Sequence, residues 1–512
     1  MIFLQPGSLT AEVPLGDWAI EHPLFAVAAA ALLAAALAFA LLLAWRSGTS
    51  PYLLLSIVLL LVVAGTAYND RWFDDFWEHA AVVRELAHHP AHPAHPLLPL
   101  TAPHAFASPY TLAVGLVARL TGLSPVRALA VSGIVNTVLL LAACYWFAAQ
   151  CRCPPFHAML STVLLWGFSP WLFSGFLHLR VLGRVAPYPS TTAFALVLLA
   201  LGCCARFFAT GQRRWLAAMV PAGAAALLIH PISGAAWFLG VAAFAVGARP
   251  FQLSRLAWAA AACALALALT RPWPLYPFWE LVGGAGAFHA SNRPLYPGTA
   301  AFLERAFPAL AGLPFLLARR RQNPRDPLML WCAALFVLYA AAGCAGLWSW
   351  GRVLPFALLP LQMAFGAWLA QSSGRARAAA LALLALCALN LSPGVAAALP
   401  FLRNNYADYA ALAPAIGPDD IVLADPAAAL VLPAFTGKVV AYPRPLAFVP
   451  DAAARRLDAA LFFDPATPDA GRQRIARRYG ARFLLFDRRR TRGFPPGLPA
   501  AESGSLVLRR LP

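Results

Sequence analysis

Charged residues are scarce in this chain of 512 residues: Asp, Glu, Lys and Arg make up 12% of it, whereas hydrophobic residues make up 61%. A soluble protein of this length needs more charge to cover its surface. Apolar runs of about 17–23 residues recur over roughly the first 400 positions, and each is long enough to cross a bilayer as a helix. The runs are continuous rather than alternating, which favours helices over a β-barrel. The composition therefore predicts a multi-spanning α-helical membrane protein.

Lysine is almost missing as well. Lys438 is the single lysine, so arginine supplies nearly all the positive charge behind the formal net charge of +18. Many arginines stand at the ends of apolar runs, where they set membrane topology, which weakens a nucleic-acid-binding interpretation. One set of loops is arginine-rich and is expected to face the cytoplasm; it contains Arg46, Arg152, Arg206, Arg213, Arg214, Arg249, Arg255, Arg319, Arg320, Arg321, Arg325, Arg375 and Arg377.

Two further motifs are lacking. The nine cysteines form no disulfide framework, and the pair Cys151 and Cys153 has no second pair to complete a metal site. No glycine-rich phosphate loop follows the first predicted strand of the C-terminal region, so we expect no nucleotide site there.

The apolar runs predict about 12 spans with both chain ends outside the cytoplasm. The predicted spans are 24–45, 51–67, 124–146, 156–175, 189–208, 215–231, 233–248, 255–271, 299–318, 327–346, 353–371 and 377–398. The segment 108–120 is apolar but short, and we predict an interfacial helix packed beside the third span.

The last part of the chain differs in composition from the spans. Predicted strands at 421–424, 438–442, 482–486 and 505–508 alternate with helices, one of which ends at Gly480. This alternation indicates a small α/β domain with a mostly parallel sheet. We therefore divide the chain into a transmembrane domain, 1–402, and an external α/β domain, 403–512, on the periplasmic side of the inner membrane.

The loop at 68–123 contains an acidic and aromatic helix. In helical geometry Asp74 shares a face with Glu78, and Asp75 shares one with His79. Neighbouring aromatic residues are expected to hold the helix against the membrane surface; they are Trp72, Phe73, Phe76 and Trp77. Carboxylates near such a low-dielectric boundary have raised pKa values and make good bases. The alternative is an interfacial helix whose acidic residues simply face water.

The same loop continues with histidines between prolines. His88, His89, His92 and His95 are possible metal ligands, to which Asp75 and His79 could add. The alternative is a stiff, extended loop, because prolines at 90, 93 and 96 separate successive histidines along the chain. A divalent metal is therefore one candidate cofactor, and no other cofactor is predicted.

Several arginines depart from the positive-inside pattern, since they fall in loops predicted to be external. They are Arg180, Arg184, Arg271, Arg293 and Arg352. Guanidinium groups bind phosphate well near a low-dielectric surface, so the set predicts a site for a lipid phosphate. His230 interrupts the sixth and seventh spans on the same side, where a polar break is tolerated if it lines a cavity. Each arginine alone could instead reach lipid headgroups or pair with a nearby acid.

Together, the external loop with Phe73-Asp74-Asp75-Phe76, the dozen predicted spans and the external arginines resemble the GT-C glycosyltransferases. These membrane enzymes use polyprenyl-phosphate sugars and include the dolichyl-phosphate-mannose mannosyltransferase-like proteins of family 39. The resemblance covers the whole chain in organisation, although its motifs are short. It departs from many members in having two predicted spans, rather than one, before the acidic loop.

The resemblance implies transfer of a sugar from a polyprenyl-phosphate donor to a cell-envelope acceptor: a lipid, a glycan or a protein. In that family an acidic residue of the first external loop acts as general base or metal partner, which falls here on Asp74 or Asp75. The external arginines would stabilise the leaving phosphate, with Glu78 and His79 in support. The alternatives are a transporter or flippase of a lipid-linked precursor, and a non-catalytic assembly protein.

Overall fold

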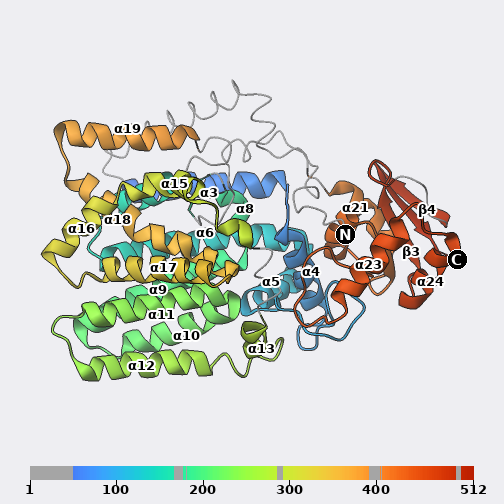
Figure 1. Cartoon of the computed structure of the whole chain (residues 1–512), viewed down its shortest axis with the longest axis horizontal. Helices are drawn as coiled ribbons and strands as arrows, with labels where there is room; N and C mark the ends of the chain where they lie inside the picture. Colours follow the sequence, from blue (N-terminus) through green and yellow to red (C-terminus); the bar gives the residue numbers. More distant parts are fainter. Residues whose placement is uncertain are drawn as a thin grey trace.

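The structure is a computed structural model that describes residues 50–166, 177–179, 181–284, 292–390, 404, 406–491 and 497–511. The predicted span at 24–45 lies outside these residues, as do the C-terminal parts, 167–175 and 391–398, of those predicted at 156–175 and 377–398. The described chain forms a bundle of roughly aligned helices with a smaller lobe at one end (Figure 1).

Among the described residues, 5 segments are long and apolar enough to span a membrane. They are α3 (Pro51–Asn69), α6 (Pro125–Gln150), α9 (Pro189–Thr210), α17 (Pro327–Cys344) and the continuous segment of η3 (Trp348–Val353) and α18 (Leu354–Gln371). All 5 coincide with predicted spans, while the full count of about 12 stays a prediction.

Shorter apolar helices complete the bundle: α7 (Pro155–Leu164), α10 (Arg214–Ile229), α11 (Pro231–Gly247) and α12 (Leu253–Ala268). The helix α19 (Gly374–Asn390) lies along one side of the bundle in Figure 1. The prediction of a single continuous span at 299–318 is wrong. The segment forms α15 (Thr299–Leu310) and α16 (Leu313–Gln322), because Pro308 and the Gly312-Leu313-Pro314 sequence interrupt the hydrogen-bond ladder between them.

Helix α18 packs closely on α7 at Gly366. A Cβ atom at Gly366 would lie 2.4 Å from the carbonyl oxygen of His157. Small residues allow such close approach between membrane helices. We expect Gly366→Ala to lower the thermal unfolding midpoint in detergent, with a cost of about 1–3 kcal/mol from overpacking. Gly298→Ala is the control, since nothing lies within 4 Å of its added Cβ; equal midpoints for the two variants would contradict this packing.

The external loop folds as two helices, α4 (Asp75–His88) and α5 (Pro109–Thr121). The bounds of α5 agree closely with the predicted segment 108–120, and α5 packs against α6. The aromatic side chains do not face a membrane surface, however. Trp72, Phe76 and Trp77 are 1%, 0% and 3% exposed and pack among residues of α5, α6 and the C-terminal region. The interpretation of these aromatic residues as membrane anchors is therefore wrong, because protein covers them.

The C-terminal lobe contains a five-stranded sheet in the order β2-β1-β3-β5-β4. Its strands are β1 (Ile421–Ala424), β2 (Lys438–Val439), β3 (Phe483–Asp487), β4 (Leu498–Ser503) and β5 (Leu506–Arg510). Helix α24 (Asp469–Tyr479) ends at Gly480, whose φ of 64° is the predicted left-handed cap. Strands β2, β1 and β3 are parallel, but β5 and β4 add antiparallel pairs. The sheet is thus mixed, and the expectation of a mostly parallel sheet is wrong because β4 returns to β5 through a tight hairpin.

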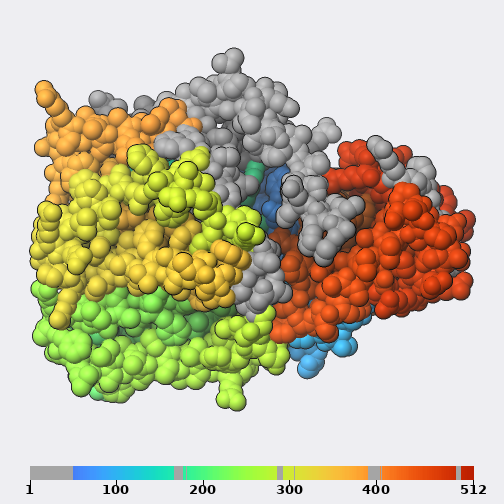
Figure 2. All heavy atoms as spheres, in the orientation of Figure 1, coloured from blue at the N-terminus to red at the C-terminus, as the bar shows by residue number. Residues whose placement is uncertain are grey.

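Other short elements of this lobe are α21 (Ala407–Leu412), η4 (Ala413–Ala415), α22 (Pro426–Val431), η5 (Leu432–Ala434) and α23 (Ala452–Phe463). One face of the sheet packs on α23 and α24. The other face shares a hydrophobic core with the external loop, including Leu97 and Leu98. Figure 2 shows this lobe gathered against one end of the bundle, and in Figure 1 α4 and α5 lie between the two.

Polar contacts also join the lobe to α4. The ammonium of Lys438 lies 2.7 Å from a carboxylate oxygen of Glu85, and both side chains are buried. Lys438 donates a second hydrogen bond to the carbonyl of His95, and Arg84 donates one to the carbonyl of Gly437. The C-terminal lobe and the acidic helix are therefore joined by a buried interface.

Candidate active site

Asp74 stands in a turn immediately before α4. The amide of Phe76 donates to the carbonyl of Phe73 over 3.2 Å, and Asp74 adopts φ 50° and ψ −125°. This conformation suits glycine at the first central position of a tight turn, and it strains other residues. The turn presents the Asp74 side chain to solvent. Partial withdrawal from water and repulsion by Asp75 raise the pKa of Asp74 above its ordinary value.

Asp75, the first residue of α4, has the opposite electrostatic environment. One of its carboxylate oxygens pairs with the guanidinium of Arg444, which lies beyond β2 in the C-terminal lobe. Burial alone would raise the pKa of Asp75, but Arg444 and then Arg352 outweigh it, so this pKa lies below the ordinary range. The two adjacent aspartates, which the sequence could not distinguish, are thus separated into a paired carboxylate and a solvent-facing one.

Arg352, in η3, is one of the predicted phosphate-binding arginines whose charge acts on this centre. Its Nε donates to the Oδ1 of Asn292 over 3.1 Å, which orients the guanidinium. Asp75 and Arg444 are its charged neighbours. Arg352 and Asp75 thus lie close enough for their charges to interact, and the phosphate site stays a prediction.

Arg184 lies beside the turn. Its guanidinium carbon is 5.2 Å from the ring centroid of Phe73, and its charge acts on Asp74. The hydroxyl of Tyr188 donates to the Phe73 carbonyl over 3.1 Å, which ties the turn to the start of α9. Arg184 is thus a second predicted arginine that the fold places beside the acidic pair.

The remaining predicted phosphate residues are not all gathered here. Arg271 and Arg293 are exposed, and in the described residues neither has a recorded contact with Asp74 or Asp75. Arg180 lies outside the described residues. His230 caps α11. Its Nδ1 accepts a hydrogen bond from the amide of Ser233 and lies 2.8 Å from the Ser233 hydroxyl oxygen. Arg352 and the titratable ring of His79 are near enough to influence His230, which places the break between α10 and α11 near the same centre.

Glu78 links Arg444 to a buried histidine. Its two carboxylate oxygens lie 4.0 Å from the Nε of Arg444 and 3.3 Å from the Nε2 of His104. The Nδ1 of His104 accepts from the amide of Phe106, so Nε2 carries the proton that points to Glu78. Glu78 is buried and contacts His104 and Arg444, and its supporting role stays a prediction.

His79 is buried, and its ring stacks on Phe106 with centroids 4.4 Å apart. Burial lowers its pKa to about 3, so the ring is neutral at physiological pH. Asp75 is paired with Arg444 and the ring of His79 is stacked on Phe106, and a metal site at these two residues stays a prediction. The proline-separated histidines also have separate partners: His88 the carbonyl of Arg84, and His89 the carboxylate of Glu85.

His95 explains the form of this loop. Its Nδ1 accepts from the amides of Leu97 and Leu98, over 3.2 and 3.1 Å, and its side chain is fully buried. Burial lowers its pKa to about 2, which keeps it neutral. Within the described ranges no group of three or more His, Cys, Asp or Glu residues is arranged to hold a metal.

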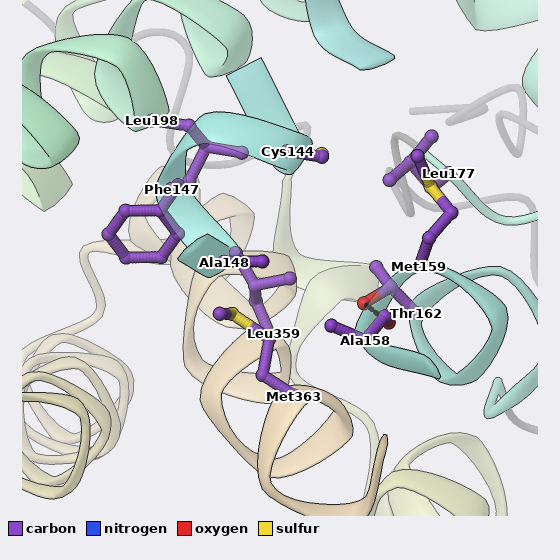
Figure 3. A pocket seen from close by; sticks show the side chains of 10 residues that line it. All are labelled: Cys144, Phe147, Ala148, Ala158, Met159, Thr162, Leu177, Leu198, Leu359 and Met363. Atoms are coloured by element: carbon purple, nitrogen blue, oxygen red, sulfur yellow. Dashed lines mark hydrogen bonds between the residues drawn. The ribbon is translucent and has the colours of Figure 1, made fainter. Parts of the chain in front are cut away.

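A narrow apolar pocket opens elsewhere, inside the bundle between α6, α7, α9 and α18 (Figure 3). Its lining includes Phe147, Met159, Leu198 and Met363, and Thr162 supplies one of its few polar groups. None of its lining residues is a carboxylate or an arginine, so it is not the acidic centre.

Comparison with known proteins gives a consistent picture of the fold. No family model and no curated protein matches the chain. Among solved structures, ArnT from Cupriavidus metallidurans bound to undecaprenyl phosphate matches with a TM-score of 0.54 at 14% identity, over 90% of this chain and 97% of that one. The archaeal oligosaccharyltransferase AglB from Archaeoglobus fulgidus, in complex with an inhibitory peptide and a dolichol-phosphate, matches with a TM-score of 0.51 at 12% identity, over 85% and 69% of the two chains. The arabinofuranosyltransferase AftD from Mycobacteria matches with a TM-score of 0.54 at 14% identity, over 90% and 39%.

The chain has the GT-C fold. The sequence-based resemblance is thereby confirmed for the architecture as a whole, over nine tenths of the chain in the comparison with ArnT. The GT-C fold here surrounds an acidic turn with arginines from three separate regions: α8 (Leu182–Val185), η3 and the segment after β2.

Sequence reasoning missed four residues around this acidic turn: Arg444, Tyr188, Asn292 and His104. Arg444 lies after the last predicted span, where arginines carry no information about membrane topology. One signal pointed to it: side chains that follow the carboxyl end of a strand in an α/β sheet often face a binding site.

Proposed function

We propose that the protein transfers a sugar from a polyprenyl-phosphate donor to a hydroxyl of a cell-envelope acceptor, on the outer face of the inner membrane. The observation that carries this is the solvent-facing Asp74, with its raised pKa, beside Arg184 and the Asp75–Arg444 ion pair, with the charge of Arg352 also acting on Asp75. The GT-C fold supports it, since two of the similar structures were solved with undecaprenyl phosphate and with a dolichol-phosphate.

In the proposed reaction, Asp74 is the general base. Its carboxylate takes the proton from the acceptor hydroxyl as that oxygen forms a bond to the anomeric carbon of the donor sugar. The bond between the anomeric carbon and the phosphate oxygen breaks, and polyprenyl phosphate leaves with the electron pair. Arg352 and Arg184 stabilise the charge on the leaving phosphate. The raised pKa suits the role, because a stronger base accepts the proton more readily.

Under this proposal residues 1–402 form the catalytic membrane domain, and the site and residues 403–512 lie outside the cytoplasm. Deleting the gene is expected to remove one sugar from an envelope lipid, glycan or protein, measured by mass spectrometry of each fraction. Plasmid-borne wild type should restore the sugar and Asp74→Asn should not. An unchanged glycan profile in every fraction would rule out the transferase proposal. Vesicles of purified protein that move a lipid-linked sugar but transfer none would support a flippase instead.

A further inference from the structure

The segment after β2 contributes directly to the acidic centre. Arg444 is 35% exposed and contacts Asp75, while its Nε faces Glu78 at 4.0 Å. No other described cation is recorded in an ion pair with Asp75. An ion pair between exposed side chains contributes little to stability. Arg444, however, lies against Asp75 and Glu78 of α4, whose side chains are only 23% and 5% exposed.

The backbone around Arg444 is held in place from both sides. The amide of Val439 donates to the carbonyl of Leu97 over 2.8 Å, which joins β2 to the external loop. Arg456 donates to the Arg444 carbonyl over 3.4 Å, and Arg455 donates to the Val440 carbonyl over 3.2 Å. The guanidinium is therefore presented from a fixed backbone rather than from a loose loop.

Tyr442 adds a second group from the same segment. Its ring is 2% exposed, and in the described part of the chain its hydroxyl is buried without a hydrogen-bond partner. Its charged neighbours are Glu78, Arg444, Asp75 and Asp74. A buried hydroxyl without a partner is costly, and a hydroxyl of a bound sugar would satisfy it.

We propose that the C-terminal lobe completes the transfer site: Arg444 is a positioning residue that holds Asp75 beside Asp74, and Tyr442 binds a sugar hydroxyl. This rests on the proposed function. Paired with Arg444, the Asp75 carboxylate is fixed and largely neutralised, so that Asp74 keeps its negative charge at working pH. Without Arg444, two adjacent carboxylates would repel each other, and the turn that presents Asp74 would lose its fixed neighbour.

The test uses full-length protein in proteoliposomes and the donor and acceptor found by envelope profiling. Arg444→Ala is expected to lower kcat about 10–100-fold with a smaller change in the donor KM, because a misplaced base slows chemistry. The acidic limb of the kcat profile should move to higher pH, since the Arg444 charge lowers the pKa of Asp74. The Asp75→Asn variant should move that limb to lower pH, because it removes the repulsion by Asp75; Arg184 faces Asp74 in every variant.

Two features distinguish positioning from general damage. The Asp75→Asn/Arg444→Ala double variant should be no slower than the slower single variant, because both changes remove one interaction. Arg444→Lys should have a higher kcat than Arg444→Ala, since lysine keeps the positive charge but lacks the paired N–H donors of the guanidinium. Tyr442→Phe should raise KM for the substrate whose sugar hydroxyl Tyr442 binds, with little loss of stability. Arg482→Ala is the matched control, because it removes an arginine 71% exposed that pairs with Asp420 in the same lobe.

Activity of folded Arg444→Ala within about twofold of the Arg482→Ala control would overturn the inference and leave the proposed function intact. Additive losses in the double variant would overturn it equally. If Arg444→Ala does not fold, Arg444→Gln and Arg444→Lys decide the question by the same kcat and pH readouts. Wild type and control that both lack transfer would instead refute the proposed function, and this inference with it.

Discussion

Asp74→Asn is expected to lower the rate of sugar transfer about 10²–10⁴-fold, which is the usual contribution of a positioned general base. Asparagine has nearly the shape of aspartate and tolerates positive φ, so the turn before α4 should persist. The raised pKa of Asp74 and its exposure to solvent are the properties that the variant removes. The rate is measured with purified protein in lipid vesicles under single-turnover conditions.

Asp74→Gly separates the base from the fold more sharply. At φ 50° and ψ −125° a residue with a side chain is strained by about 1–3 kcal/mol, and glycine adopts this conformation freely. The glycine variant should therefore unfold at the same temperature as wild type or higher, yet transfer no more sugar than Asp74→Asn. Loss of activity together with retained stability would mean that the strained aspartate serves chemistry rather than folding.

The control for both variants is Asp419→Asn, an exposed aspartate of the C-terminal lobe. It should transfer sugar at the wild-type rate. If Asp74→Asn also kept the wild-type rate, Asp74 would not be the base, and Asp75 would be the carboxylate to test next.

Lys438→Met is expected to have the largest effect on stability, a loss of about 3–5 kcal/mol for docking of the lobe on α4. The variant leaves Glu85 buried without its cation, although Glu85 still accepts hydrogen bonds from His89 and the amide of Ala94. The change is measured as the unfolding midpoint in detergent and as hydrogen exchange in the 89–107 segment. The lobe should open before the helical bundle unfolds, because only the interface has lost a contact.

The double variant Glu85→Met/Lys438→Met tests whether the loss comes from an unpaired charge. Replacing both members of a buried pair by apolar groups is often neutral, so it should recover most of the stability that Lys438→Met loses. Arg482→Ala breaks an exposed pair in the same lobe and should cost less than about 1 kcal/mol. A double variant as unstable as Lys438→Met would show that packing, not charge, holds the interface.

Local features of the fold were predictable from the sequence where one short-range signal dominates. Strand β1 occupies the predicted residues, and Gly480 ends α24 in the left-handed conformation that glycine favours. Contacts between distant segments were not predictable. The packing of Trp77 against Phe435 depends on residues far along the chain, so its aromatic ring was wrongly assigned to a membrane surface.

The residues of the candidate site were likewise predictable only where a signal is visible in the nearby sequence. Asp74 and Asp75 were found because charged residues beside aromatic ones are unusual in so apolar a chain. Arg184 and Arg352 were found because they break the charge bias of their loops. Arg444 carried no such signal, since arginine is common in the C-terminal lobe, and its role appears only when the lobe is seen against α4.

The buried pair between Lys438 and Glu85 joins residues 353 positions apart, which affects how the protein is made. At about 5–20 residues per second, the ribosome needs roughly 20–70 s after Glu85 to reach Lys438. During that time the acidic helix has been synthesised, but the cations that pair with Glu85 and Asp75 have not. The acidic centre can therefore form only after nearly the whole chain has been translated, so a truncated product would contain the carboxylates without the groups that position them.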